Sequence, residues 1–394
     1  MPIRKLAAAL LAGALLVIPA CKPATTSTPA SPAAASTSGV DQAGMDKTIA
    51  PGDDFNAYTN GGWIKATPIP PDKPSYGIFP ILADETRKRT VSLIQEAAGA
   101  GPSAGGDARK AGDFYLTFMD EAAIESKGFS PLKSELNAIG DIKDRQQLSA
   151  IIGGHLRADV DPLNNTNFET GNLFGVWITQ GLTDPDHNIP YLLQGGLGMP
   201  DRDYYLSKSP QMAELRKSYL AHIETMFKLA GYMDAPARAA RVFALETKIA
   251  GFHATRTESE DVRAAVSWKH EELAVRAPGL DWPALLDAAA LKDAPVFIVW
   301  HPKAVTGISA LAAKEPLDAW KDWLVLHTIE QAASFLPKAF VEESFNFYGR
   351  GAGAHAGDRA RIKEWRLDRS VEPGKRSPRS SCPQANRFQA SARD

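Results

Sequence analysis

The chain has 394 residues, 44% of them hydrophobic, and a formal net charge of −2 at pH 7. This length is ample for a large buried core, in one large lobe or two smaller ones. No stripe of Lys and Arg interleaves with aromatic residues, so nucleic-acid binding is a poor hypothesis. Cys21 and Cys382 are the two cysteines, so residues 22–349 must be held by their core rather than by disulfides.

The first residues predict export. Arg4 and Lys5 precede an apolar run at 6–18, which is followed by Pro19, Ala20 and Cys21. This pattern is typical of a secretory signal peptide, and the run is too short to span a bilayer comfortably. Residues 18–21 also resemble a bacterial lipobox, in which the cysteine is lipidated; ordinary cleavage nearby, with Cys21 incidental, is the alternative. We predict a lipoprotein-type signal peptide at 1–21, lipidation of Cys21, and a lipid-anchored location in the bacterial cell envelope or periplasm.

The following segments predict a tether and then a mainly helical domain. Residues 22–45 are rich in Ala, Ser, Thr and Pro, which is typical of a flexible linker, and the folded domain is expected at 46–349. Apolar residues at helical spacing predict helices at 81–98, 111–124, 146–156, 212–229, 235–250 and, as a long amphipathic stretch, 316–336. Strands are expected at 173–179 and 296–300. The predicted fold class is therefore mainly α, with many helices and a minor β component.

Residues with catalytic or metal-binding chemistry are scarce. A zinc-peptidase helix places two histidines one turn apart, with a glutamate between them that activates water. Residues 270–274 begin this way, but Ala274 stands where the second histidine is needed, so a charged helix surface is the better interpretation. His222 and Glu224 are two apart and point to different helix faces. The other histidines show no ligand spacing, although one or two can meet in space: His155, His187, His253, His301, His327 and His355. We predict no catalytic and no metal-binding residue in this chain.

Five ordered sequence blocks carry a family resemblance. They are PGDDFNAYTNGGW at 51–63 with the nearby 69–72 and 76–79, Phe114-Tyr115 with Met119-Asp120-Glu121, QGGLGMPDRDYYL at 194–206, Leu245-Glu246-Thr247 with Ile249-Ala250, and FNFYG at 345–349. Together they resemble the neprilysin family of zinc metalloendopeptidases, which includes neprilysin, the endothelin-converting enzymes and bacterial counterparts. The bacterial members are the closer match, because the cysteines of the animal ectodomains are absent.

The resemblance implies a helical N-terminal domain that covers a catalytic cleft and restricts access to peptides, with zinc as the family's cofactor. Some members place an arginine just before the Tyr-Gly-x-Phe element to meet a peptide carboxylate; here that residue is Ser75, so no such contact is expected and the substrate-binding residues are unknown.

We interpret the blocks as packing elements rather than substrate contacts. Gly61-Gly62-Trp63 predicts a tight turn beside an apolar anchor. Gly195, Gly196 and Gly198 predict backbone conformations that a side chain would forbid. Tyr204 and Tyr205 are expected to pack their rings and to place their hydroxyls at hydrogen-bond partners.

The residues after FNFYG depart from the family pattern. The family's zinc helix, its third ligand and its substrate-binding strand lie downstream of this block, whereas residues 350–394 hold nine Arg and two Lys against five acidic residues. We predict a disordered or frameshifted tail at 350–394; a basic tail that binds anionic lipid is the alternative. Two functions follow: a truncated, inactive member of a family that hydrolyses oligopeptides, which binds no zinc itself, or a non-catalytic envelope lipoprotein that binds peptides or a partner protein.

Overall fold

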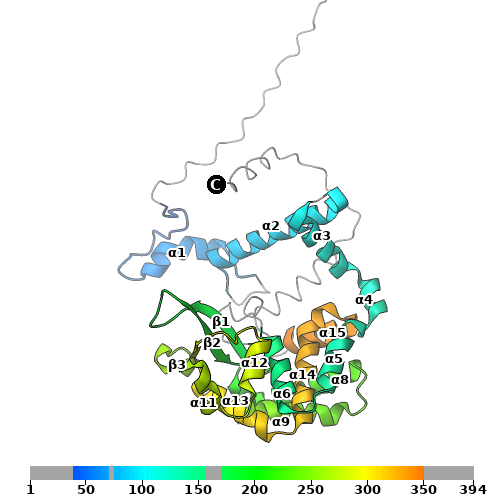
Figure 1. Ribbon diagram of the computed structural model, residues 1–394. Helices are drawn as coiled ribbons and strands as arrows, with labels where there is room; N and C mark the ends of the chain where they lie inside the picture. Colours follow the sequence, from blue (N-terminus) through cyan, green and yellow to red (C-terminus); the bar gives the residue numbers. More distant parts are fainter. Residues whose placement is uncertain (1–38, 71–74, 104, 157–169, 350–394) are drawn as a thin grey trace, which may run out of the picture. The chain divides into compact units, whose positions relative to one another are not determined.

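The computed structural model describes residues 39–70, 75–103, 105–156 and 170–349 (Figure 1). The chain divides into two compact units, Met1–Leu93 and Ile94–Asp394. The predicted signal peptide, most of the tether, Cys21 and the basic tail lie outside the described residues.

The smaller unit contains helix α1 (Phe55–Ala66) and most of helix α2 (Ile78–Ala100). The Asp54 carboxylate caps α1 by accepting a hydrogen bond from the N–H of Ala57 at 2.8 Å. The prediction of a tight turn at Gly61-Gly62-Trp63 was wrong, because these residues lie inside α1.

Close packing, rather than a turn, explains the glycines of α1. The Trp63 N–H donates to the carbonyl of Gly44 at 2.9 Å, so the preceding segment lies directly on the helix. A Cβ on Gly62 would be 2.9 Å from the carbonyl oxygens of Gly44 and Met45, and one on Gly61 would be 2.8 Å from the Asp46 Cβ. Side chains at these positions would therefore push the segment off the helix.

Most helices of the structure belong to the larger unit. The α-helices are α3 (Gly106–Met119), α4 (Glu121–Lys127), α5 (Lys133–Gly140), α6 (Arg145–His155), α7 (Arg202–Leu206), α8 (Pro210–Leu229), α9 (Ala235–Ala250), α10 (Arg256–Ser259), α11 (Leu273–Arg276), α12 (Trp282–Ala288), α13 (Pro302–Lys314), α14 (Leu317–Ala332) and α15 (Lys338–Ser344). Shorter 3-10 turns are η1 (Gly101–Ser103), η2 (Ser130–Leu132), η4 (Val262–Ala264), η5 (His270–Glu272) and η6 (Ala333–Phe335), and η7 (Phe345–Gly349) is a π-helical turn.

Four strands form one small mixed sheet in the order β1-β2-β4-β3. They are β1 (Phe174–Gln180), β2 (Asn188–Gln194), β3 (Val266–Lys269) and β4 (Val296–Val299). β1 pairs with β2 and β3 with β4 in antiparallel fashion, whereas β2 and β4 are parallel. One face of the sheet joins the main core through Phe174, Leu192 and Phe297, and the other carries a small cluster around Tyr191 and Ile298. In Figure 1 the strands gather at one side of this unit and α8, α14 and α15 at the other.

Helix α14 runs through the core of the larger unit. Trp320 and Trp323 are almost fully buried, and so is every residue from Asp322 to Ile329. The sequence predicted an amphipathic helix at 316–336, but α14 is buried on all sides from Asp322 to Ile329, as helices in the middle of a large core are. The charged exception, Asp322, is held by the guanidinium groups of Arg238 and Arg241 on α9. Burial raises the pKa of Asp322, and the two arginines oppose that rise.

The fold class expected from the sequence, mainly α with a minor β component, is confirmed. The predicted helices at 81–98, 146–156, 212–229 and 235–250 correspond to α2, α6, α8 and α9. The helix expected at 111–124 is instead two helices, because Asp120 ends α3 and caps α4 through the N–H of Ala123. Strands β2 and β3 were not predicted.

Candidate functional site

The strongest concentration of polar chemistry is a buried group that we call the Glu246 cluster: Glu246, Tyr205, Tyr219 and His327. The Oε2 atom of Glu246 accepts hydrogen bonds from the Tyr205 hydroxyl at 2.8 Å and the Tyr219 hydroxyl at 2.9 Å. His327 Nε2 lies 2.9 Å from Oε1 of the same carboxylate. The Glu246 residue is 0% exposed, so these contacts replace its water completely.

Four different helices supply this cluster. Tyr205 comes from α7, Tyr219 from α8, Glu246 from α9 and His327 from α14. Burial, followed by the charge of Glu246, raises the pKa of both tyrosines well above the ordinary value. Both hydroxyls therefore stay protonated and serve as donors. A carboxylate shared in this way fixes the packing of the four helices.

The glycine-rich block at 194–206 is bound to the same cluster. The Tyr205 hydroxyl accepts hydrogen bonds from the backbone N–H groups of Gly198 at 3.1 Å and Met199 at 2.9 Å. Trp323 donates its indole N–H to the carbonyl of Gly196 at 3.1 Å. The expectation that Tyr205 places its hydroxyl at hydrogen-bond partners is confirmed.

The three glycines of this block are needed for two different reasons. Gly196 has a φ of 85°, a left-handed conformation that favours glycine. Gly195 and Gly198 have no positive φ, so for them the predicted backbone reason was wrong. A Cβ on Gly198 would lie 1.9 Å from the Tyr219 hydroxyl, and one on Gly195 would lie 2.3 Å from the carbonyl oxygen of Asn172. Close approach of neighbouring groups excludes side chains there.

His222 forms a second buried polar site. Its Nε2 atom lies 2.8 Å from Glu330 of α14 and its Nδ1 atom 2.9 Å from Glu343 of α15. The imidazole also stacks on Phe347 of η7, with ring centroids 4.7 Å apart. Burial alone would lower the pKa of His222, but the two glutamates overcome this effect and raise it to about 9. These partners could not be predicted from spacing, because they lie more than 100 residues away.

His253 and His301 form a third buried site beside β2. His253 Nε2 lies 2.9 Å from the carbonyl oxygen of Gly195, and His301 Nδ1 accepts a hydrogen bond from the N–H of Gln194 at 3.1 Å. Burial lowers the pKa of each histidine to about 4. Both imidazoles are therefore neutral near pH 7 and act as structural hydrogen-bonding groups.

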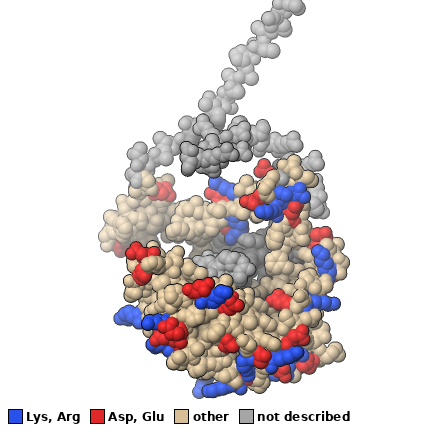
Figure 2. Space-filling model, viewed as in Figure 1, with Lys and Arg blue, Asp and Glu red and all other residues tan. Residues whose placement is uncertain are grey.

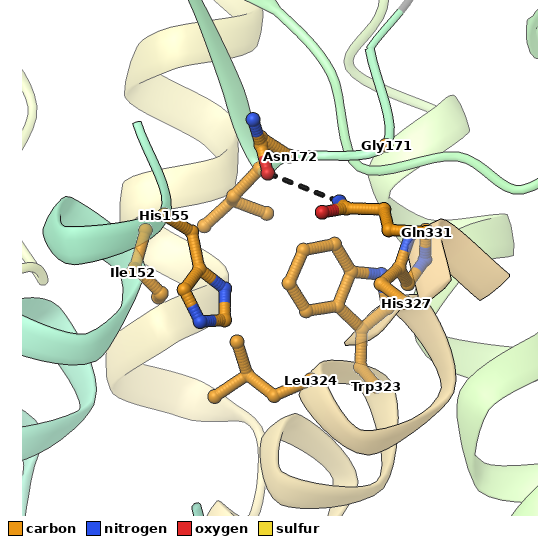
Figure 3. Close-up of a pocket in the computed structure, with 9 residues that line it drawn as sticks. Ile152, His155, Gly171, Asn172, Trp323, Leu324, His327 and Gln331 are labelled. Carbon is orange, nitrogen blue, oxygen red and sulfur yellow. Dashed lines mark hydrogen bonds between the residues drawn. The ribbon is translucent and has the colours of Figure 1, made fainter. Parts of the chain in front are cut away.

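A small, shallow pocket lies beside the Glu246 cluster (Figure 3). Its lining includes His155, Asn172, Trp323, His327 and Gln331. Figure 3 shows His155 on one side and His327 on the other, with the Trp323 ring between them. His155 Nε2 lies 3.1 Å from Glu135, and burial lowers the His155 pKa although Glu135 opposes this. Two of the scattered histidines therefore do meet around one pocket, as the sequence left open.

The residues considered as zinc ligands do not form a metal site. His270 lies in the short turn η5, and its Nδ1 atom is 3.1 Å from the carbonyl oxygen of Ala294. Within the described residues, no group of three or more His, Cys, Asp or Glu side chains is arranged to hold a metal ion. The donor set of this part of the chain therefore does not fit zinc.

Glu246 is the residue that sequence reasoning undervalued. It was placed in a family block that was interpreted as a packing element, and no hydrogen bonds of its carboxylate were expected. A signal was available, because Val242, Leu245 and Ile249 mark the apolar face of α9 and Glu246 lies on that face. A carboxylate in such a position requires buried partners.

The face drawn in Figure 2 gives no sign of a nucleic-acid partner. Figure 2 shows basic and acidic side chains interspersed over the visible face, without a broad basic area. Electrostatic recognition of phosphate backbones relies on clustered Lys and Arg.

Comparison with known proteins adds the family relationship. The model of Peptidase family M13 matches residues 51–368, which takes the similarity past Gly349. Mouse (Mus musculus) endothelin-converting enzyme 1 is 24% identical over 324 residues, covering 77% of this chain and 39% of the enzyme. The crystal structure of Mycobacterium tuberculosis zinc metalloprotease Zmp1 in complex with an inhibitor is similar with a TM-score of 0.67 and 30% identity, over 79% of this chain and 47% of Zmp1. PepO from Lactobacillus rhamnosis shares the fold, with a TM-score of 0.59 at 15% identity, over 80% of this chain and 49% of PepO.

The chain thus spans less than half the length of these relatives. The family match covers most of the sequence and includes the blocks at 51–63, 194–206 and 345–349. These findings confirm the resemblance drawn from those blocks, and the chain belongs to Peptidase family M13.

Proposed function

We propose that this chain serves in the hydrolysis of peptide bonds as part of a zinc metallopeptidase, and that its helical unit limits which peptides reach the zinc centre. The observation that carries the proposal is the match of residues 51–368 to Peptidase family M13, together with the likeness to Zmp1. The multi-helix core around the Glu246 cluster supports a rigid scaffold rather than a reacting centre.

We further propose that the described residues do not hydrolyse peptides by themselves. Their donor groups do not fit zinc, since the described part of the chain holds no suitable group of three ligands. The carboxylate of Glu246, the one most fully buried, is bound to two tyrosine hydroxyls and lies next to His327, which leaves it without access to a water molecule in a cleft. No catalytic step is therefore assigned to residues of this part.

Zinc content and hydrolysis test this assignment directly. The purified chain, residues 22–394, is assayed for bound zinc by mass spectrometry and for cleavage of a quenched fluorescent peptide. We expect the zinc content to be well below one ion per chain. We also expect no chelator-sensitive cleavage of the peptide. Stoichiometric zinc with chelator-sensitive cleavage would overturn the proposal that this chain does not hydrolyse peptides by itself.

A domain exchange tests the restricting role. Residues 51–349 of this chain replace the matching part of Zmp1, and cleavage of peptides of increasing length is compared with that of Zmp1 itself. We expect the upper size limit of the substrates to change with the exchanged helical unit. A folded, active chimera with the size limit of Zmp1 would contradict that role.

Export and lipid anchoring remain part of this proposal. They are supported by Arg4, Lys5, the apolar run at 6–18 and Cys21. Among the residues with described structure, no helix is long and apolar enough to cross a membrane. Labelling of expressing bacteria with a radioactive fatty acid is expected to mark the wild-type chain and to miss the Cys21→Ser variant; equal labelling of both would exclude Cys21 as the anchor.

A further inference from the structure

Strand β1 forms one edge of the sheet and has few of the features that protect edge strands. It is seven residues long, Phe174–Gln180, and carries no charged side chain. The opposite edge strand, β3, has only four residues and ends in Lys269. Natural proteins commonly block open edges with short strands, charges or prolines. Of the two edge strands, β1 is therefore the less protected against pairing with another strand.

The register shows which backbone groups of β1 point away from the sheet. The N–H of Gly181 donates to the carbonyl of His187 at 3.0 Å, next to the Gln180–Asn188 pair. Hydrogen-bonded and non-hydrogen-bonded pairs alternate along an antiparallel ladder, so Trp177 and Thr179 bond to β2, whereas Ile178 does not. Pro190, which has no N–H, stands opposite Ile178 and agrees with this assignment. The N–H and C=O of Ile178 therefore face outward.

The outward-facing part of β1 is accessible only toward the β1–β2 hairpin. Phe174, Gly175 and Val176 are buried, whereas Trp177 is 40% and Ile178 46% exposed. Successive strand residues point to opposite faces, so these two apolar side chains flank the edge on both sides. The carbonyl of Gln180 is already bound by the Tyr191 hydroxyl at 2.6 Å. Among the described residues, none forms a backbone hydrogen bond to the outer side of 177–180.

These features define a short docking edge with a particular chemistry. We propose that Trp177–Gln180 binds an extended peptide segment by strand addition, with the outward N–H and C=O of Ile178 pairing with its backbone. Exposed Trp177 and Ile178 select small or β-branched apolar side chains on the two faces of the added strand. The exposed Asp186 of the hairpin loop favours a basic residue in the peptide, whereas the Asp184 carboxylate already lies 2.9 Å from His187 Nδ1.

The size of the edge favours a peptide over a second copy of this chain. A stable protein–protein interface buries at least about 1,000 Å² in total, and the segment Trp177–Gln180, with three exposed residues and the half-buried Thr179, supplies only a small part of that area. A short extended segment needs much less surface, because main-chain hydrogen bonds carry its recognition. The inference concerns backbone recognition and holds whether or not the chain takes part in peptide hydrolysis.

Binding of a defined probe tests the proposal. The probe is the fluorescently labelled peptide Lys-Val-Thr-Val-Thr with blocked ends, titrated into the purified chain and followed by fluorescence anisotropy. An analogue with every backbone amide of its Val-Thr-Val stretch N-methylated keeps the side chains but loses the donors. We expect the analogue to bind at least about tenfold more weakly, as loss of one or two backbone hydrogen bonds implies.

Variants of the chain locate the binding edge. Ile178→Pro removes the outward N–H without touching the ladder to β2 and is expected to weaken binding about tenfold, whereas Ile178→Val should retain it. Val266→Lys alters the exposed β-branched residue of the other edge strand and should leave binding unchanged. Thermal unfolding measurements check that each variant folds. If Ile178→Pro does not fold, the comparison of the probe with its N-methylated analogue on the wild-type chain still tests the proposal.

Three outcomes would overturn the proposal. The first is equal binding of the probe and its methylated analogue. The second is unchanged binding by a folded Ile178→Pro variant. The third, seen by analytical ultracentrifugation, is a dimer that Ile178→Pro abolishes, which would make a second copy the occupant of the edge.

Discussion

Ala290 holds a backbone conformation that suits glycine better. Its φ is 56°, and among the described residues it is the one non-glycine residue with a positive φ. It follows the end of α12. There the N–H of Leu291 donates to the backbone carbonyl of Leu286 at 2.8 Å, and the N–H of Ala290 donates to the backbone carbonyl of Asp287 at 3.1 Å. This is a Schellman motif, whose left-handed position is usually glycine.

Replacing Ala290 with glycine should therefore stabilise the protein. We expect Ala290→Gly to raise the free energy of unfolding by about 0.5–1 kcal/mol, because relief of the left-handed strain exceeds the added entropy of the unfolded chain. Chemical denaturation measures the change. The control Ala288→Gly, in the last helical position of α12, should lower stability by about the same amount. A loss of stability in Ala290→Gly would contradict this account.

Gly198 shows the opposite case, in which space rather than φ requires glycine. A Cβ there would overlap the Tyr219 hydroxyl and so displace a donor of the Glu246 cluster. We expect Gly198→Ala to destabilise by about 3 kcal/mol, from overpacking and from a weakened buried hydrogen bond. Gly154→Ala is the matched control, because Gly154 lies exposed in α6 with open space around it and should gain about 0.5–1 kcal/mol. Similar effects of both substitutions on the unfolding transition would be inconsistent with the crowding at Gly198.

At the scale of elements, His222 joins α8 to α14 and α15 through one buried charge. Its pKa is raised from 6.5 to about 9, so the folded state holds its proton more tightly than the unfolded chain. The resulting stability is fully present below pH 6.5 and is lost as the pH rises through about 9. A shift of this size corresponds to about 3 kcal/mol. We expect thermal unfolding scans to show a fall in the melting temperature between pH 7 and pH 9.5.

The variant His222→Gln isolates this effect. It removes the titrating group, so the alkaline fall in its melting temperature should be much smaller than in the wild type. His253 and His301 provide an internal control on the acid side. Their pKa is lowered to about 4, so the unfolded chain takes up protons first and stability falls as the pH drops from 6.5 toward 4. That acid fall should persist in His222→Gln, and an unchanged alkaline fall would rule out His222 as its source.

The limits of prediction from sequence follow from particular elements. Helices α8 and α9 were predicted well, because their apolar residues recur on one face and their ends carry local signals such as Ser209 and Pro236. Strand β2 was not predicted, since it contains Pro190 and lies directly before the glycine-rich block. Strand β3 has only four residues, too few for an alternating pattern to emerge.

The polar sites were harder to predict than the helices. The partners of Glu246 and His222 come from helices that are distant in sequence, so spacing carries no information about them. The role of Gly61 and Gly62 was mistaken for the same reason. Their close contacts are with the segment Gly44–Asp46. The local sequence does not reveal this packing partner, so the two adjacent glycines were interpreted as a turn.

At the scale of the whole molecule, the two compact units differ in how their side chains are buried. The larger unit contains a continuous apolar core that includes Trp282, Trp320 and Trp323. In the smaller unit, Met1–Leu93, the described residues that are buried are Gly44, Asp46 and Gly61, none with a large apolar side chain. On α2, Phe79 is 81% and Leu93 65% exposed. The hydrophobic contribution to stability is therefore concentrated in the larger unit.

This difference predicts unequal local stability along the chain. Helices with few buried apolar contacts open by local fluctuations, whereas core helices exchange their amide hydrogens only when the whole core unfolds. We expect hydrogen–deuterium exchange, read by mass spectrometry, to label α1 and residues 78–93 within minutes and α9 and α14 only after hours. Gly62→Ala, which would push the segment Gly44–Asp46 off α1, should speed exchange in α1 further and leave α14 unchanged. Protection of α1 and residues 78–93 equal to that of α14 would contradict this prediction, because it would require contacts beyond the described residues to stabilise the smaller unit.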